Sequence, residues 1–169
     1  MMGEALAAAG NREAAGKRFR SALALRPDLR GVHYVLGEMF LESGDYENAE
    51  REFRAEAQMV PGSAAAAYQL GFVLLNRGRV RDAIAELQRS NTLQPDMPET
   101  LLELGKAMAT AGEVADAEKL FRRVLENEQT SRLAGTAHFQ LAQIYRKLGR
   151  SADADREMAL SQQLRGKRK

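Results

Sequence analysis

The chain has 169 residues, of which 44% are hydrophobic and only 6% aromatic, and it contains neither Cys nor Trp. The absence of cysteine excludes disulfides, zinc–thiolate sites and thiol catalysis. The formal net charge is +2, and four basic residues at the C-terminus, Arg165, Lys167, Arg168 and Lys169, contribute +4 to it. Residues 1–164 are therefore close to neutral.

The composition also predicts the fold class and a default location. Ala, Leu, Glu, Arg and Gln dominate while β-branched residues are scarce, which favours an all-α protein. No stretch approaches the ~20 consecutive apolar residues of a membrane-spanning helix, and the N-terminus shows no signal peptide. A cytoplasmic protein is the default expectation, with a periplasmic or secreted location left open if the chain is a fragment.

The first predicted elements form an incomplete helical hairpin. Residues 2–9 are predicted to be the stump of one helix and residues 12–26 the helix that follows it. The run from Gly10 to Arg18 superficially resembles a phosphate-binding loop. Five residues separate its two glycines and no Ser or Thr follows Lys17, which argues against nucleotide binding.

The next segment predicts a complete hairpin, with helices over 29–42 and 46–59. Apolar residues recur at helical spacing along one face of each helix. Gly44 ends the first helix, and Asp45 is able to cap the second. Pro61 ends the unit, because proline cannot occupy a helix interior.

This hairpin recurs with a period of 34 residues, and its last copy follows after three extra residues in the 126–134 connection. The later helices are predicted over 63–76, 80–93, 97–110, 114–127, 131–147 and 151–164. Five kinds of position keep the period: a Leu-Gly pair (Leu36-Gly37, Leu70-Gly71, Leu104-Gly105), a turn Gly (Gly44, Gly78, Gly112), a small residue (Ala49, Ala83, Ala117), a large apolar residue (Phe53, Leu87, Phe121) and a closing Pro (Pro27, Pro61, Pro95). A single hairpin leaves an apolar face bare, so only stacking against neighbours buries it.

The pattern closely resembles the tetratricopeptide repeat, although the early large residue of that family is not Trp here. The resemblance implies an all-α, right-handed solenoid of about four and a half units, acting as a scaffold that holds peptides or helices on a concave face. We expect one solenoid over residues 1–164 and a basic, disordered tail over 165–169. Its units are a partial 1–28, then 29–62, 63–96, 97–130 and 131–164.

The resemblance places the first helix of each pair on the concave face and thereby predicts a binding surface. An apolar ladder is expected from the residues two before each Leu of the Leu-Gly pair, since exposed aromatic clusters often mark contact sites. The alternative is that some of these side chains pack between neighbouring helices. The predicted partner-contacting residues are Tyr34, Val35, Glu38, Tyr68, Gln69, Phe72, Leu75, Leu102, Glu103, Lys106, Phe139 and Gln143, with Glu42, Asn76, Glu99, Gln140, Arg146 and Lys147 as further polar residues of the groove.

Apolar anchors among mixed charges suit an amphipathic helix or an extended peptide of another protein. The Lys and Asn pattern that similar proteins use to grip chaperone C-termini is missing. The acidic and basic groove residues nearly cancel, which argues against nucleic acid because phosphate binding needs a basic track. The alternative function is an end-to-end oligomerising scaffold, or a fragment of a larger multidomain protein, because exposed solenoid ends tend to associate.

No catalytic, cofactor or metal site is predicted. His33 and His138 occupy the same place in their units, far apart along the stack, so matching packing roles explain them better than catalysis. The pairs Glu38–Glu42 and Glu99–Glu103 lie one helical turn apart but lack a third ligand. A non-enzymatic protein is therefore expected.

Overall fold

The computed structural model describes the backbone of residues 2–166 and the side chains of residues 13–166. Within these residues it contains helices and no strands, which confirms the all-α solenoid. The helices are α1 (Met2–Leu25), α2 (Val32–Glu42), α3 (Tyr46–Met59), α4 (Ala64–Asn76), α5 (Val80–Leu93), α6 (Pro98–Ala111), α7 (Val114–Asn127), α8 (Arg132–Lys147) and α9 (Ser151–Gly166).

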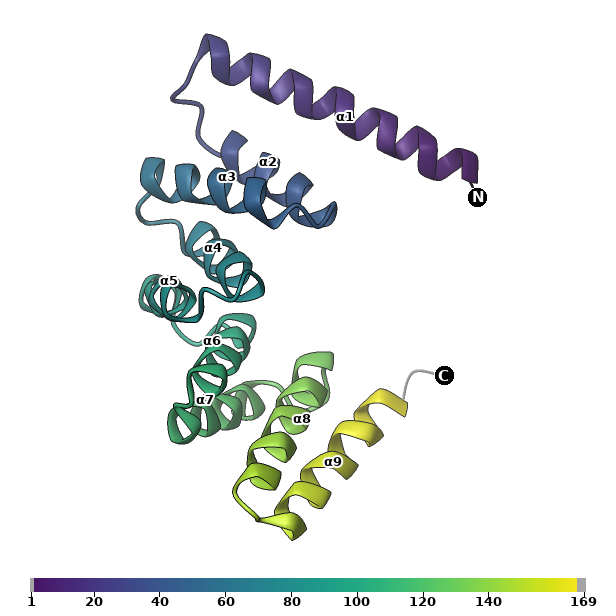
Figure 1. Ribbon diagram of the computed structural model, residues 1–169, viewed down its shortest axis with the longest axis vertical. Coiled ribbons are helices and arrows are strands. Elements are labelled where there is room, and N and C mark those ends of the chain that lie inside the picture. Colours follow the sequence, from purple (N-terminus) through teal and green to yellow (C-terminus); the bar gives the residue numbers. More distant parts are fainter. Residues whose placement is uncertain (1, 167–169) are drawn as a thin grey trace.

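Helices α2 to α9 form four antiparallel hairpins, each stacked on the next along the chain (Figure 1). The stack curves, and α1 and α9 both project towards the side on which the curve opens. The first helices of successive hairpins contact each other directly, α4 with α6 and α6 with α8. We call the surface that α2, α4, α6 and α8 line on the open side the concave face.

Glycine ends the first helix of every hairpin from α2 onward. Gly44, Gly78, Gly112 and Gly149 have φ between 72° and 87°, in the left-handed region that side-chain-bearing residues avoid. Directly after the first of these turns, the Asp45 carboxylate accepts a hydrogen bond from the Asn48 backbone N–H, as the predicted N-cap requires.

The N-terminal segment departs from the prediction of a partial hairpin. Residues 2–25 form one continuous helix that includes Gly10, instead of a stump and a second helix. A helix of eight residues is too short to be stable without packing. The chain therefore continues its helix through Gly10.

The C-terminal helix is longer than predicted. It extends to Gly166 and includes Arg165, which was expected to begin a disordered tail. The guanidinium of Arg165 lies 5.5 Å from the centre of the Phe139 ring on α8, a contact that favours the two additional helical residues. The remainder of the predicted tail, residues 167–169, lies outside the described residues.

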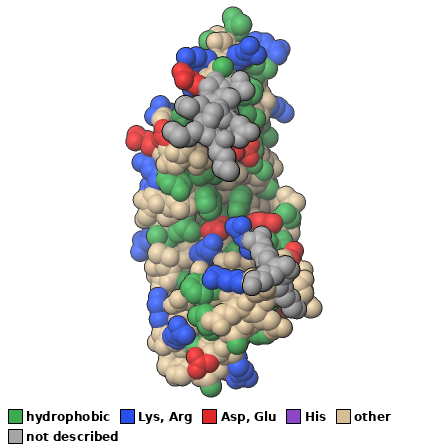
Figure 2. Space-filling view, turned by 90° about the vertical axis from the view of Figure 1, so that its right-hand side faces the viewer, with side chains coloured by type: hydrophobic (Ala, Val, Ile, Leu, Met, Phe, Trp, Pro, Cys, Tyr) green, Lys and Arg blue, Asp and Glu red, His purple; other side chains and the backbone are tan. Residues whose placement is uncertain are grey.

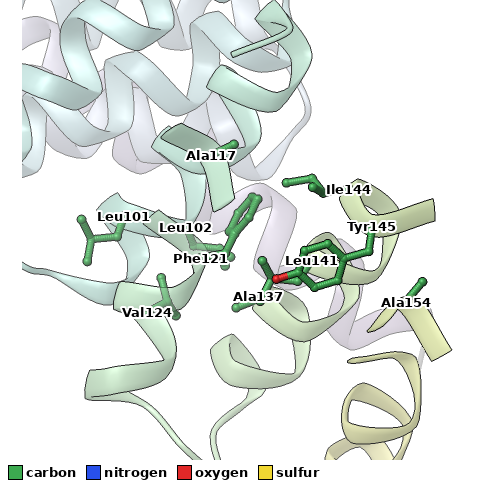
Figure 3. Close-up of a cluster of buried hydrophobic side chains, with 10 residues drawn as sticks. All are labelled: Leu101, Leu102, Ala117, Phe121, Val124, Ala137, Leu141, Ile144, Tyr145 and Ala154. Atoms are coloured by element: carbon green, nitrogen blue, oxygen red, sulfur yellow. The ribbon is translucent and has the colours of Figure 1, made fainter. Parts of the chain in front are cut away.

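The core lies between the two helices of each hairpin and between successive hairpins. Figure 3 shows one cluster in which side chains from α6, α7, α8 and α9 converge. The small residues of the repeat permit this packing. A Cβ atom added to Gly37 or Gly105 would lie 2.7 Å or 2.6 Å from the ring of Phe53 or Phe121 respectively, so the rings fill space that only glycine leaves.

Glutamate carboxylates link the hairpin α2–α3 to α4–α5 and the hairpin α6–α7 to α8–α9. Glu50 of α3 is 3% exposed and forms ion pairs with Arg54, Arg77 and Arg79, the last two from the turn between α4 and α5. In α7, Glu118 accepts a hydrogen bond of 2.9 Å from the Tyr145 hydroxyl of α8.

The two histidines have matching structural roles. His33 Nδ1 lies 2.7 Å from a carboxylate oxygen of Glu52, and His138 Nδ1 lies 2.6 Å from one of Glu157. Each pair joins the first helix of a hairpin to the second, and all four side chains are partly buried. This agrees with a packing role at equivalent places in two repeats.

Candidate functional site

An aromatic row crosses the N-terminal half of the concave face. Tyr34 on α2 and Tyr68 and Phe72 on α4 are each half-buried, so each exposes part of its ring. The rings of Tyr68 and Phe72 stack at 6.5 Å, while the ring of Tyr34 contacts Phe53 edge-on at 5.6 Å. Figure 2 shows this side of the molecule, with hydrophobic side chains gathered across its middle and charged side chains beside them.

The two tyrosine hydroxyls lie in a partly apolar and acidic environment. Burial, reinforced by the nearby carboxylates of Glu103 and Glu99, raises the pKa of Tyr68 to about 12. The pKa of Tyr34 is also raised, chiefly by burial, although a hydrogen bond of 3.4 Å donated by the Gln69 amide opposes the shift. Both phenols therefore stay protonated and able to donate hydrogen bonds at neutral pH.

A hollow opens beside Tyr68, between the N-terminal ends of α4 and α6. It has a volume of about 200 Å³. We call it the α4–α6 hollow; it is lined by Ala64, Ala65, Tyr68, Ser90, Gln94, Met97, Glu99 and Thr100. Met97, Gln94 and Ser90 were not predicted as part of the site, because they belong to α5 and the loop after it and meet Tyr68 only through the stacking of hairpins.

A second hollow of about 560 Å³ lies between α6 and α8. We call it the α6–α8 hollow; it is lined by Lys106, Ala109, Thr110, Phe139, Gln140, Gln143 and Lys147. Three of the predicted contact residues, Lys106, Phe139 and Gln143, meet here although they are far apart in the sequence. Phe139 is half-buried and Gln143 exposed.

Two of the predicted contact residues pack against the hydrophobic core. Leu102 is only 3% exposed and packs with Phe121 and Leu141, so the ladder of apolar anchors is interrupted at α6. Leu75 is partly buried against two core clusters. The third and fourth hairpins approach closely enough to cover Leu102, which its place in the repeat does not reveal.

The remaining predicted residues differ in how accessible they are. Val35 is 36% exposed and Glu38 half-buried. Glu103 is 8% exposed and forms an ion pair of 2.7 Å with Lys106, one turn further along α6. Glu103 is therefore a partner for Lys106 and not the freely accessible carboxylate that the sequence predicted.

The described part of the chain contains no group of three or more His, Asp and Glu side chains placed to hold a metal ion. None of its helices is both long enough and apolar enough to cross a membrane. What the concave face does offer is a row of half-exposed aromatic rings, two hollows and charged side chains of both signs.

A curved stack of helical hairpins with such a face defines the class of helical-repeat scaffolds. A tetratricopeptide repeat model matches residues 1–64, 68–132 and 102–155, and a second tetratricopeptide repeat model matches residues 40–91. These matches span most of the chain, which belongs to the tetratricopeptide repeat family. Members of this family serve as protein-interaction scaffolds and are generally not catalytic.

Solved structures with the same fold are distant in sequence. A crystal structure of MamA is 18% identical, with a TM-score of 0.86 over 99% of this chain and 96% of that one. MamA from Desulfovibrio magneticus RS-1 is 16% identical, with a TM-score of 0.85 over 99% and 93%. YrrB, described as a protein with an unusual peptide-binding site, is 19% identical, with a TM-score of 0.82 over 98% and 84%. The comparison with curated protein sequences gives no significant match.

Proposed function

We propose that this protein binds a peptide or amphipathic helix of another protein on its concave face, without catalysing a reaction. The observation that carries the proposal is the aromatic row of Tyr34, Tyr68 and Phe72, which lies half-exposed on two neighbouring first helices. Aromatic side chains supply large contact areas, and Tyr suits a surface that is partly wet because its hydroxyl can remain hydrogen-bonded.

The hollows add places for side chains of the partner. Phe139, at the edge of the α6–α8 hollow, continues the apolar surface beyond the interruption at Leu102. Burying three aromatic side chains at ~25 cal/mol/Å² is largely offset by association costs of ~4–15 kcal/mol. We therefore expect exchangeable binding with a Kd in the micromolar range.

The test is capture from the native lysate with three baits. The first is the chain itself, the second carries Tyr34→Ala, Tyr68→Ala and Phe72→Ala, and the third carries Leu93→Ala and Leu160→Ala. Leu93 and Leu160 are 41% and 42% exposed on the second helices α5 and α9, so the third bait controls for the loss of apolar surface elsewhere. Circular dichroism verifies that all three baits are equally helical.

A partner retained by the first and third baits and lost by the second supports the proposal. The captured protein is then purified, and its affinity is measured by isothermal titration calorimetry. Because buried aromatic anchors each contribute about 1 kcal/mol or more, the aromatic triple variant should bind at least roughly tenfold more weakly. Equal affinity of the wild-type chain and the triple variant would show that the partner binds elsewhere.

A further inference from the structure

The two ends of the concave face carry opposite charge. In the half formed by α2, α4 and the N-terminal end of α6, Glu99 of α6 is exposed in the α4–α6 hollow, and Glu38 of α2 lies close enough to Tyr34 to raise the pKa of its hydroxyl. Glu99 acts in the same direction on Tyr68. Two carboxylates thus lie among the aromatic rings that the proposed function uses.

The C-terminal half is basic. Lys106 and Lys147 both line the α6–α8 hollow, Lys106 as the ion-pair partner of Glu103. Arg165 of α9 adds a third positive charge, because its guanidinium lies over the Phe139 ring. No carboxylate lines this hollow.

The ion pair between Glu103 and Lys106 lies at the boundary between the two halves. Its two charges offset each other at 2.7 Å, so it adds little to either end. Glu99 and Lys147, by contrast, have no ion-pair partner among the residues with described side chains. An external ligand is therefore able to pair with both.

The length of the face sets the size of the ligand. Hairpins stacked at the ~8–10 Å spacing of packed helices place α2 and α8, three hairpins apart along the stack, about 24–30 Å from each other. A helix rises 1.5 Å per residue, so one of about 16–20 residues spans this distance. Such a helix is long enough to contact the aromatic row, both hollows and both charged ends at once.

Building on the proposed function, we propose that the partner is an amphipathic helix with segregated charges: Lys or Arg towards the end that lies on α2 and α4, and Asp or Glu towards the end that lies on α8. The apolar side of the partner contacts the aromatic row and Phe139, and the charges fix the direction in which it lies. Like charges brought together in the reversed orientation disfavour that orientation, so the face selects one direction.

A displayed library of 18-residue helices tests this proposal. Leucines occupy the apolar positions at helical spacing, and every other position is drawn equally from Lys, Glu, Gln and Ser. Selection on the intact chain should enrich sequences that carry Lys in one terminal third and Glu in the other. A selected peptide should bind about tenfold more tightly than its charge-reversed twin at low salt, with the difference shrinking as salt screens the charges.

A charge swap supplies the matched control. The variant with Glu99→Lys and Lys147→Glu keeps the net charge and should prefer the charge-reversed twin. The variant with Glu126→Lys and Arg81→Glu makes an equivalent swap at exposed positions of the second helices α7 and α5, and it should bind like the wild-type chain.

Disulfide trapping reads the orientation directly, since the chain has no cysteine of its own. The selected peptide, with a cysteine at its basic end, should cross-link to the Ala65→Cys variant and not to the Gln143→Cys variant. Peptides with a cysteine at the acidic end should show the opposite pattern.

The outcomes of these experiments distinguish the charge-segregated helix from the proposed function on which it rests, binding on the concave face. Binders that depend on Tyr34, Tyr68 and Phe72 but show no segregation of charge, or cross-link equally to both variants, overturn the inference and leave the proposed function standing. A selection that yields no binder lost by the aromatic triple variant overturns both.

Discussion

At the scale of single residues, the repeat depends on a few positions where one atom decides the packing. Gly37, Gly71 and Gly105 each face a large side chain of the second helix in their own hairpin. The repeat register places Ala142 and Met158 at the corresponding positions of the last hairpin, where the flexible Met side chain stands in place of Phe or Leu. Glycine recurs at these three positions with the period of the repeat.

We expect Gly105→Ala to destabilise the fold. The new Cβ would lie 2.6 Å from the Phe121 ring, which is fully buried and cannot move aside. Overpacking of this kind costs about 1–3 kcal/mol, more than the ~1 kcal/mol that alanine contributes to helix stability. Urea denaturation should show a lower free energy of unfolding by about 1 kcal/mol, within those limits.

Gly135→Ala is the matched control for that substitution. A Cβ at Gly135 meets its nearest neighbour, Leu164 Cβ, at 3.5 Å, so the same change there should stabilise the protein. Adding Phe121→Met to Gly105→Ala imitates the last hairpin and should restore part of the lost stability. If Gly105→Ala proved as stabilising as Gly135→Ala, the packing argument would be wrong.

The raised pKa of Tyr68 predicts how stability changes at high pH. An unfolded tyrosine loses its proton near pH 10, whereas Tyr68 in the folded chain keeps its proton until about pH 12. The native state therefore binds more protons in this range, and the free energy of unfolding should fall as pH rises between the two values. Below pH 10 the contribution is fully present.

Spectrophotometric titration of tyrosinate absorbance, combined with denaturation at each pH, measures this effect. Tyr68→Phe should remove the ionisation near pH 12 and make the fall in stability shallower. Ionisation of all four tyrosines near the ordinary value would contradict the environment described for Tyr68.

At the scale of helices, neighbouring elements are held together to different extents. Helices α2 to α9 pack in pairs and bury at least one residue each, and the carboxylates of the buried Glu50 and the partly buried Glu118 join successive hairpins. Helix α1 has no second helix of its own. In its described part, Gly16 packs near Met39 of α2 while Leu25 remains 84% exposed.

We therefore expect α1 to open more readily than the helices of the central hairpins. Hydrogen exchange monitored by mass spectrometry should show amides of residues 13–25 in α1 at least about tenfold less protected than those of α6, because few buried contacts hold this part of the helix against local unfolding. Met39→Ala should lower protection of α1 further while leaving α6 unchanged. Equal protection of α1 and α6 in the wild-type chain would show that α1 belongs to the same cooperative unit.

At the scale of the whole molecule, the curvature brings together residues that the sequence separates by whole repeats. Gln69, which follows Tyr68 on α4, donates a hydrogen bond to the Tyr34 hydroxyl of α2, and Lys106 shares a hollow with Phe139 and Lys147. The net charge reveals none of this, because the acidic and basic ends of the concave face nearly cancel in the total.

The sequence by itself determined the all-α repeat, the turns and the helices from residue 32 onward to within a few residues at their ends. These features are local: a proline ends a helix, a glycine takes the left-handed turn, and apolar spacing marks the buried face. It also indicated Tyr34, Tyr68, Phe72 and Phe139 as half-exposed candidates, because the repeat assigns each a place on its helix.

Only the tertiary structure decided which of those candidates remain accessible. Leu102 occupies the same place in its unit as Tyr34 and Tyr68, yet it is buried because the next hairpin covers it. The placement of Arg165 over Phe139 likewise depends on how α9 packs against α8. A residue's place in the repeat sets the side of the helix on which it lies, but exposure depends on what packs against that side.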